Sequence, residues 1–351
     1  MSGVITVRRN DDAEQVELTT TTTGLDLFGD DRSVVAMRVN GESRDLQREL
    51  SDGDTVEPIL IDEPEGLSIV RHSAAHVTAQ ALQNLFADAK LGIGPPITDG
   101  FYYDFQTSPL TPEDMKSIEK RMGQIVKEKQ RFVRRVVTDD EARAELADEP
   151  FKLELISDKG SASADDGSSV EVGAGDLTIY DNVRRDGSVA WKDLCRGPHV
   201  PNTGYLGNGW ALTRTSAAYW RGDQSKADLQ RVYGTAWPTK DELQAYKTRL
   251  EEAAKRDHRK LGTELDLFSF NELVGSGLPL FHPKGGVIKR EMEDYVRARH
   301  IEEGFDYVGT PHIAKEELFY TSGHLPYYAD GMFPALLEDV ERDEQGNITK
   351  G

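Results

Sequence analysis

The feature that most constrains the fold is a change in amino-acid composition near residue 65 of this 351-residue chain. Residues 1–66 hold no lysine, and 16 Asp and Glu against 6 Arg give this segment a net charge of −10. Its apolar residues gather in short runs at 4–7, 34–39 and 56–61, with turn residues such as Asn40-Gly41 between them. The pattern predicts a small strand-rich domain that binds or docks rather than catalyses.

Helical spacing of apolar residues follows the linker-like sequence at 63–66. Helices are predicted over 68–87, 111–132, 239–261 and 286–303. A basic cluster at 127–135 is expected at the end of the second helix, and strands around turns are expected at 93–97 and 99–105. Residues 157–175 are rich in Ser, Gly and Asp, which predicts a mobile surface insertion.

Composition excludes several classes of protein. Hydrophobic residues make up 37% of the chain, enough for real cores. The net charge of −20 argues against a general nucleic-acid coat, although a local basic face remains compatible with RNA binding. The single cysteine, Cys195, excludes an intramolecular disulfide. Because no apolar run approaches the ~18 residues of a membrane span and the N-terminus lacks an apolar signal, we expect a cytoplasmic protein without membrane contact.

Two pairs of residues carry metal-binding or hydrolytic chemistry. His72 and His76 are four residues apart on a predicted helix, which places both imidazoles on one face. Cys195 and His199 flank Gly197-Pro198, which indicates a loop. Each pair alone is more often structural than functional. Together they fit either a tetrahedral zinc site or a metal-free hydrolytic pocket. In the metal-free pocket a histidine would be the general base, and Asp193 or Lys152 would orient the reacting groups or donate a proton to them.

Four longer motifs point to a known family. They are R-H-S-A-A-H at 71–76, K-L-G-I-G-P-P-I-T-D-G-F-Y-Y-D-F at 90–105, W-K-D-L-C-R-G-P-H-V at 191–200 and L-T-R-T-S-A-A-Y-W-R-G-D at 212–223. These motifs closely resemble the bacterial threonyl-tRNA synthetase family, and the resemblance spans nearly the whole chain.

The resemblance implies an α+β multidomain fold. Residues 1–64 resemble a ubiquitin-like β-grasp (TGS) domain, and residues 65–234 resemble the family's α+β editing domain. Residues 235–261 would then be a linker helix, and residues 262–351 the start of a class II catalytic domain with an antiparallel sheet. Residues 285–311 resemble class II motif 1, a long helix followed by a strand that ends in proline. In the family this element builds the homodimer interface.

The implied function is threonine–tRNA ligation, the ATP-dependent attachment of threonine to tRNA(Thr). The family uses ATP with Mg²⁺ and one Zn²⁺, and the residues that bind them are expected beyond residue 351. This chain alone is therefore expected to catalyse only the editing reaction, which hydrolyses mischarged seryl-tRNA(Thr). Editing is needed because one methyl group in a pocket discriminates by only ~1–3 kcal/mol.

The resemblance also assigns the editing pocket. Its expected residues are His72, His76, Cys195, His199, Tyr103, Lys152 and Asp193. A histidine, or a histidine–lysine pair, would activate water and protonate the leaving ribose oxygen, and Cys195 would be a wall that tests the amino-acid side chain. No metal is expected at this site. Candidate RNA contacts are the cluster at 127–135, Arg214, Arg221 and the segment 255–260.

Two other functions remain open at this point. A freestanding trans-editing hydrolase fits the length of the chain, but it has no use for the motif 1 segment. A non-catalytic zinc or RNA-binding module is supported by the TGS-like segment and by the His and Cys spacing.

Overall fold

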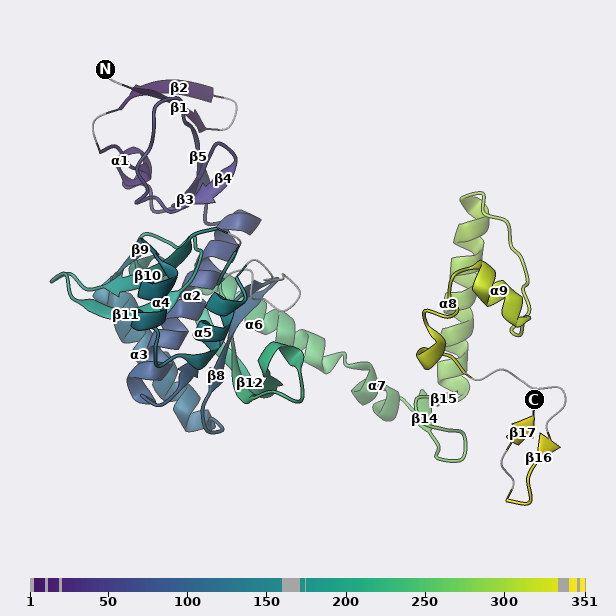
Figure 1. Ribbon diagram of the computed structural model, residues 1–351. Coiled ribbons are helices and arrows are strands. Elements are labelled where there is room, and N and C mark those ends of the chain that lie inside the picture. The colour runs from purple at the N-terminus through teal and green to yellow at the C-terminus, as the bar shows by residue number, and fades with distance from the viewer. Residues whose placement is uncertain are drawn as a thin grey trace. The chain divides into compact units, whose positions relative to one another are not determined.

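The computed structural model describes residues 3–9, 12–18, 21–159, 171–173, 175–333, 341–345 and 348–350 (Figure 1). The chain divides into two compact units, residues 1–254 and 255–351. In the described ranges, no helix has both the length and the apolar character needed to cross a membrane. Most of the predicted surface insertion, residues 160–170 and 174, lies outside the described residues.

The first sheet is built from the acidic N-terminal segment. Its strands are β1 (Val4–Arg9), β2 (Asp12–Glu17), β3 (Val34–Val39), β4 (Glu42–Arg44) and β5 (Thr55–Leu60), in the order β2-β1-β5-β3-β4. Strands β1 and β5 pair in parallel at the centre, and the other pairs are antiparallel. A short helix, α1 (Gly24–Phe28), connects β2 and β3. The three apolar runs at 4–7, 34–39 and 56–61 supply β1, β3 and β5, which confirms their prediction as strands.

The central helix α2 (Pro64–Leu85) confirms the helix predicted over 68–87. Pro64 lies in its first turn, where a missing N–H leaves no hydrogen bond unmade. Every residue from 69 to 82 is buried, so this part of the helix is covered on all sides rather than amphipathic. It packs against β3 and β5 of the first sheet, and against α3 (Pro112–Glu128) and β8 (Gly100–Gln106), which follow it in the chain.

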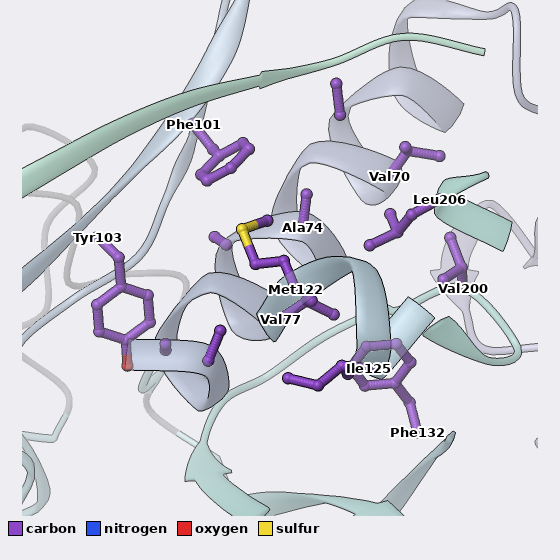
Figure 2. Close-up of a cluster of buried hydrophobic side chains, with 14 of the residues drawn as sticks. Val70, Ala74, Val77, Phe101, Tyr103, Met122, Ile125, Phe132, Val200 and Leu206 are labelled. Atoms are coloured by element: carbon purple, nitrogen blue, oxygen red, sulfur yellow. The ribbon is translucent and has the colours of Figure 1, made fainter. Parts of the chain in front are cut away.

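Two antiparallel sheets complete the first unit. One has the order β12-β13-β8-β6, with β7 paired to β8, and the other has the order β11-β10-β9. Their strands are β6 (Lys90–Leu91), β7 (Pro96–Ile97), β9 (Arg131–Val137), β10 (Leu177–Val183), β11 (Val189–Leu194), β12 (Trp210–Tyr219) and β13 (Asp228–Ala236). The connecting helices are α4 (Asp139–Glu145), α5 (Pro150–Ser157), η2 (Thr203–Leu206) and η3 (Trp220–Gly222). Side chains from α2, α3 and β8 form one apolar core among these elements (Figure 2).

The basic cluster at 127–135 does not lie on one helix, so that prediction is wrong. Helix α3 ends at Glu128, and Lys129 adopts a left-handed conformation with φ of 51°. The chain then enters β9, where Arg131, Arg134 and Arg135 lie. Because successive side chains of a strand point to opposite faces, Arg134 and Arg135 are separated from each other.

The C-terminal part differs from the sequence prediction at two points. The single helix expected over 239–261 is two helices, α6 (Lys240–Lys255) and α7 (His258–Glu264), and Asp257 caps the second. The strand expected at 305–311 after the motif 1 helix is also wrong, because these residues form no strand.

The second unit has few buried side chains. It contains β14 (Phe268–Phe270), β15 (Pro279–Phe281), α8 (Pro283–Glu302), α9 (Glu316–Thr321), η4 (Ala329–Gly331), β16 (Glu341–Arg342) and β17 (Ile348–Lys350). Helix α8 confirms the helix predicted over 286–303. Strands β14 and β15 pair with each other, and Phe270, Leu280 and Phe281 remain exposed. Apolar surface of this kind normally packs against further structure.

Candidate active site

Helix α2 brings the first two imidazoles into the interior. His72 and His76 lie one turn apart, and their ring centroids are 5.1 Å apart in an edge-to-face arrangement. Ser73, between them in sequence, donates its hydroxyl to the Ile69 carbonyl within the helix. The same Ser73 oxygen accepts the Val200 N–H at 3.1 Å, which ties the helix to the loop that follows β11.

Strand β11 and its loop supply the opposite wall. Trp191, Asp193 and Cys195 alternate along the chain and are all buried, as side chains on one face of a strand are. The turn after Cys195 requires glycine at position 197. Its φ is +71°, and a Cβ there would overlap the Tyr180 hydroxyl. The turn directs His199 back toward Cys195.

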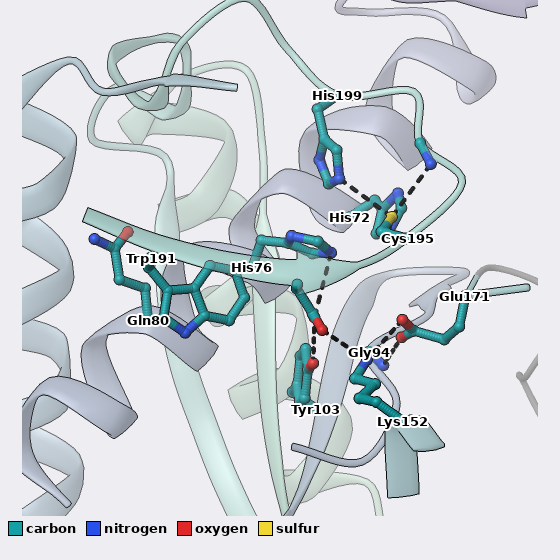
Figure 3. Close-up of polar contacts among 12 residues, drawn as sticks. His72, His76, Gln80, Gly94, Tyr103, Lys152, Glu171, Trp191, Cys195 and His199 are labelled. Atoms are coloured by element: carbon teal, nitrogen blue, oxygen red, sulfur yellow. Dashed lines mark hydrogen bonds and ion pairs between the residues drawn. The ribbon is translucent and has the colours of Figure 1, made fainter. Parts of the chain in front are cut away.

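The two pairs predicted from sequence meet in one cluster (Figure 3). The Cys195 Sγ atom lies 3.3 Å from His72 Nε2 and 3.4 Å from His199 Nε2, and it accepts the Gly197 N–H at 3.2 Å. The potential ligand atoms of His72, His76, Cys195 and His199 all lie within 4.8 Å of one another. None of the four side chains is more than 4% exposed.

A buried charged network adjoins this cluster. The Lys152 Nζ atom, on α5, lies 2.7 Å from Glu171 Oε2 and 2.9 Å from Asp193 Oδ1. Tyr103, on β8, donates its hydroxyl to Asp193 Oδ2 at 2.5 Å. Gly94 donates its N–H to the other oxygen of Glu171 at 3.1 Å. One ammonium group therefore lies between two buried carboxylates, which gives the network a formal charge of −1.

His76 connects the cluster and the network. Its Nε2 atom lies 3.9 Å from Asp193 Oδ2, too far for a hydrogen bond. Among the described residues neither ring nitrogen of His76 has a hydrogen-bond partner, although the side chain is fully buried. Trp191 packs edge-to-face on the ring at 5.5 Å. A buried polar ring without partners costs stability, and such groups are typical of sites that bind water, an ion or a substrate.

Burial keeps the three imidazoles neutral at physiological pH. It lowers the pKa of His72 to about 4, and the Lys152 charge acts in the same direction. Burial and the neighbouring imidazoles hold the pKa of His76 and of His199 well below 6.5. Each neutral ring therefore has one N–H and one unprotonated nitrogen.

The other titratable groups of the site have raised pKa values, which favour their protonated forms. Burial raises the pKa of the Cys195 thiol, so this side chain stays protonated. Burial also raises the pKa of Asp193 and of Glu171, although Lys152 opposes this effect. The two carboxylates in turn raise the pKa of Lys152, which stays charged.

The buried histidines are expected to lower the stability of the first unit as the pH falls from 6.5 to 4, while the raised pKa of buried carboxyl groups such as Glu171 acts in the opposite direction. In this window the unfolded chain protonates its histidines at their ordinary pKa, whereas the folded chain excludes those protons, so stability falls as the pH falls. The shift of His72 alone corresponds to ~3 kcal/mol. Urea unfolding at pH 4, 5.5 and 7 measures the slope. The His72→Gln variant is expected to show a weaker dependence of the unfolding free energy on pH. A control substitution at the exposed His300 is expected to keep the dependence of the wild type. Equal slopes in both variants would contradict the burial argument.

The cluster also has the donors of a zinc site. A tetrahedral Zn²⁺ with nitrogen and sulfur ligands holds them about 3.5 Å apart. The two Sγ–Nε2 distances of 3.3 and 3.4 Å are close to this value. The side chains therefore fit a zinc ion as well as a metal-free hydrolytic site.

The structure brings all seven predicted site residues together in the His and Cys cluster and the charged network beside it, from α2, β8, α5, β11 and the following loop. The predicted RNA contacts are dispersed. Arg135 pairs with Glu145 and Asp181, and Arg221 pairs with Asp158, so these charges are largely engaged within the protein.

Sequence reasoning missed two acidic residues. The composition of residues 157–175 places Glu171 in a surface insertion, but this side chain is 1% exposed and pairs with Lys152. The two valines that flank it, in Val-Glu-Val at 170–172, are the sequence feature that indicates burial. Asp45, from the first sheet's domain, accepts the His199 N–H and the Tyr180 hydroxyl, each at 2.7 Å. No signal in sequence connects Asp45 to a residue 154 positions away.

Comparison with known proteins agrees with this geometry. Residues 172–233 match the family model for the threonyl and alanyl tRNA synthetase second additional domain. The matched segment contains Asp193, Cys195 and His199.

Curated relatives match a much longer part of the chain. The threonine–tRNA ligase of Cutibacterium acnes is 62% identical over 351 residues, which is 100% of this chain and 51% of the relative. The chain is similar to threonine–tRNA ligases along its full length. The ligase of Leifsonia xyli is 63% identical over 92% of the chain, and that of a Nocardioides strain is 62% identical over 95%. The resemblance found in the sequence is thereby confirmed. The chain spans about half the length of these relatives.

Proposed function

We propose that this chain carries the hydrolytic editing site of a threonine–tRNA ligase and removes serine from mischarged tRNA(Thr). The observation that carries the proposal is the buried cluster in which neutral imidazoles lie beside a network that holds a charged lysine. A neutral imidazole can accept a proton from water, and an ammonium group can stabilise negative charge or donate a proton.

The reaction follows from these protonation states. A histidine, His72 or His76, takes a proton from water, and the water oxygen attacks the ester carbonyl carbon of the seryl group. The bond from that carbon to the terminal ribose oxygen breaks, and the oxygen takes a proton from the imidazolium or from Lys152. The products are free serine and tRNA with a free terminal hydroxyl group.

Cys195 is a wall of this pocket rather than a nucleophile. Burial disfavours the thiolate that nucleophilic attack requires. Its sulfur is also surrounded by His72, His199 and the Gly197 N–H. A side chain so confined excludes a substrate by shape, and shape is the property in which threonine and serine differ.

The longer protein would attach threonine to tRNA(Thr), using ATP with Mg²⁺ and one Zn²⁺ bound by residues beyond 351, and would form a homodimer through the motif 1 region. Residues 1–64 would be the TGS domain, 65–234 the editing domain, 235–261 the linker and 262–351 the start of the catalytic domain. The mixed sheet with its central parallel pair, β1 and β5, supports the first assignment. The family match at 172–233 supports the second.

The chain is expected to hydrolyse seryl-tRNA(Thr) and to spare threonyl-tRNA(Thr). Release of the labelled amino acid from each substrate, measured with and without the chain, tests this selectivity. Equal hydrolysis of both esters would show that the pocket does not perform editing.

Treatment with a chelator distinguishes a metal-free editing site from a site that holds zinc. We infer that the editing site works without a metal, so EDTA is expected to leave deacylation unchanged. Loss of activity with EDTA and its recovery with Zn²⁺ would instead assign the His and Cys cluster to a zinc ion.

A further inference from the structure

A cleft of about 520 Å³ adjoins the loop that carries Cys195 and His199. It lies within the first unit, between the first sheet's domain and the sheet of β9 and β10. Four arginines line it, two from each side: Arg44 and Arg48 from the first domain, and Arg134 and Arg196 from the second. This arginine cleft is unusual in a chain with a net charge of −20.

The arginines outnumber the acidic groups of the cleft. Its acidic lining residues are Glu42, Asp45 and Asp176. Glu42 accepts a hydrogen bond from Arg44 at 3.1 Å. Among the residues that the structure describes, neither Arg48 nor Arg134 forms an ion pair. Two guanidinium groups are therefore available to a ligand, one from each domain.

The buried carboxylate of the cleft, Asp45, already accepts hydrogen bonds from the protein. Asp45 is 5% exposed, and its two oxygens accept the His199 N–H and the Tyr180 hydroxyl. Burial raises the pKa of Asp45, and these hydrogen bonds, followed by the charges of Arg134 and Arg48 at longer range, oppose the rise. The carboxylate is thus committed to hydrogen bonds within the protein. Because it holds the backbone of His199, the cleft and the candidate active site share one loop.

Two other clefts on the first unit have a different character. The one beside β1 holds Arg8, Arg9 and Arg38, but four acidic residues accompany them: Asp30, Asp31, Glu57 and Glu63. The one near the β10–β11 turn is smaller, and Arg184 there lies 4.0 Å from Glu128. The arginine cleft combines a positive lining with direct contact to the active-site loop.

We propose that the arginine cleft binds phosphate groups of the RNA strand whose aminoacylated end enters the editing pocket. This inference rests on the proposed function. The planar guanidinium forms paired hydrogen bonds to phosphate oxygens, and a strand that reaches the pocket carries a phosphate at every nucleotide. Contributions from both domains would make RNA binding depend on their fixed relative placement within this unit.

The test compares the double variant Arg48→Gln/Arg134→Gln with the control Arg185→Gln, at an exposed residue on the β10–β11 turn. Fluorescence anisotropy with labelled, uncharged tRNA(Thr) gives Kd at several salt concentrations. The double variant is expected to weaken binding by on the order of 10- to 100-fold. It should also reduce the slope of log K against log salt by about 0.7 to 0.9 for each phosphate that the protein no longer neutralises.

Wild-type affinity and salt slope in the double variant would overturn the proposal, as would an equal weakening in the Arg185→Gln control. Because the probe is uncharged tRNA, the result does not depend on hydrolysis. Arginine-dependent binding by a chain that fails to deacylate seryl-tRNA(Thr) would reject the proposed function alone. Deacylation by wild type together with unchanged binding in the double variant would reject the cleft alone.

Discussion

Replacement of Lys152 by methionine is expected to destabilise the first unit by ~3–5 kcal/mol at pH 7. The ammonium group lies between Glu171 and Asp193, and all three side chains are fully buried or 1% exposed. Methionine fills most of the volume but leaves two carboxylates without a counter-charge. The free energy of unfolding in urea measures the effect.

The deficit is expected to shrink as the pH falls. Burial raises the pKa of both carboxyl groups, and loss of Lys152 removes the charge that opposes this. A carboxyl group with a raised pKa in the folded state is most compatible with folding when protonated, so acid relieves the variant relative to wild type. Lys159→Met is the matched control, because Lys159 pairs with Asp139 at the surface, where such pairs contribute ~0–1 kcal/mol. Equal destabilisation in both variants would contradict the role assigned to Lys152.

Replacement of His76 by alanine is expected to lower the deacylation rate by ~10²–10⁴-fold. His76 is the imidazole whose nitrogens have no partner among the described residues, and it lies between the Cys195 cluster and Asp193. Its unprotonated nitrogen and its N–H are therefore available to a water molecule or to the substrate. Single-turnover rates with seryl-tRNA(Thr) measure the decrease.

Two comparisons make this result specific. Cys195→Ala is expected to cost much less than His76→Ala, because a wall contributes shape rather than proton transfer, and it should increase hydrolysis of threonyl-tRNA(Thr). His300→Ala, on the exposed surface of α8, is expected to leave the rate unchanged. A larger decrease in Cys195→Ala than in His76→Ala would reverse the roles given to the two residues.

The spacing of apolar residues along the chain predicted several individual strands and helices. The strands β1, β3 and β5 and the helix that carries His72 and His76 follow from the spacing of apolar residues. The types and spacing of His72, His76, Cys195 and His199 suggested that the helix and the Cys195 loop meet across 123 residues, and the resemblance to a family added Tyr103 to the site.

The errors have physical causes. The charged helix after residue 239 reads as continuous, but Asp257 caps a new helix and breaks it. Strand β9 begins with basic residues that suit a helix end equally well, and the left-handed Lys129 separates the two elements. Glu171 lies at the edge of a polar segment, and only the buried ammonium of Lys152 explains its position in the interior. Asp45 reaches the site because the segment that forms the first sheet packs against the loop of His199, and no local signal encodes this packing.

The most direct test of the central claim is the single-turnover rate of seryl-tRNA(Thr) deacylation at saturating protein, compared between wild type and His72→Ala. Saturating protein removes differences in RNA affinity, so the rate reports the chemical step at the pocket. We predict fast deacylation by wild type and a rate near the uncatalysed one for the variant. Equal rates for the two proteins would show that the chemistry does not take place among His72, His76, Cys195 and His199.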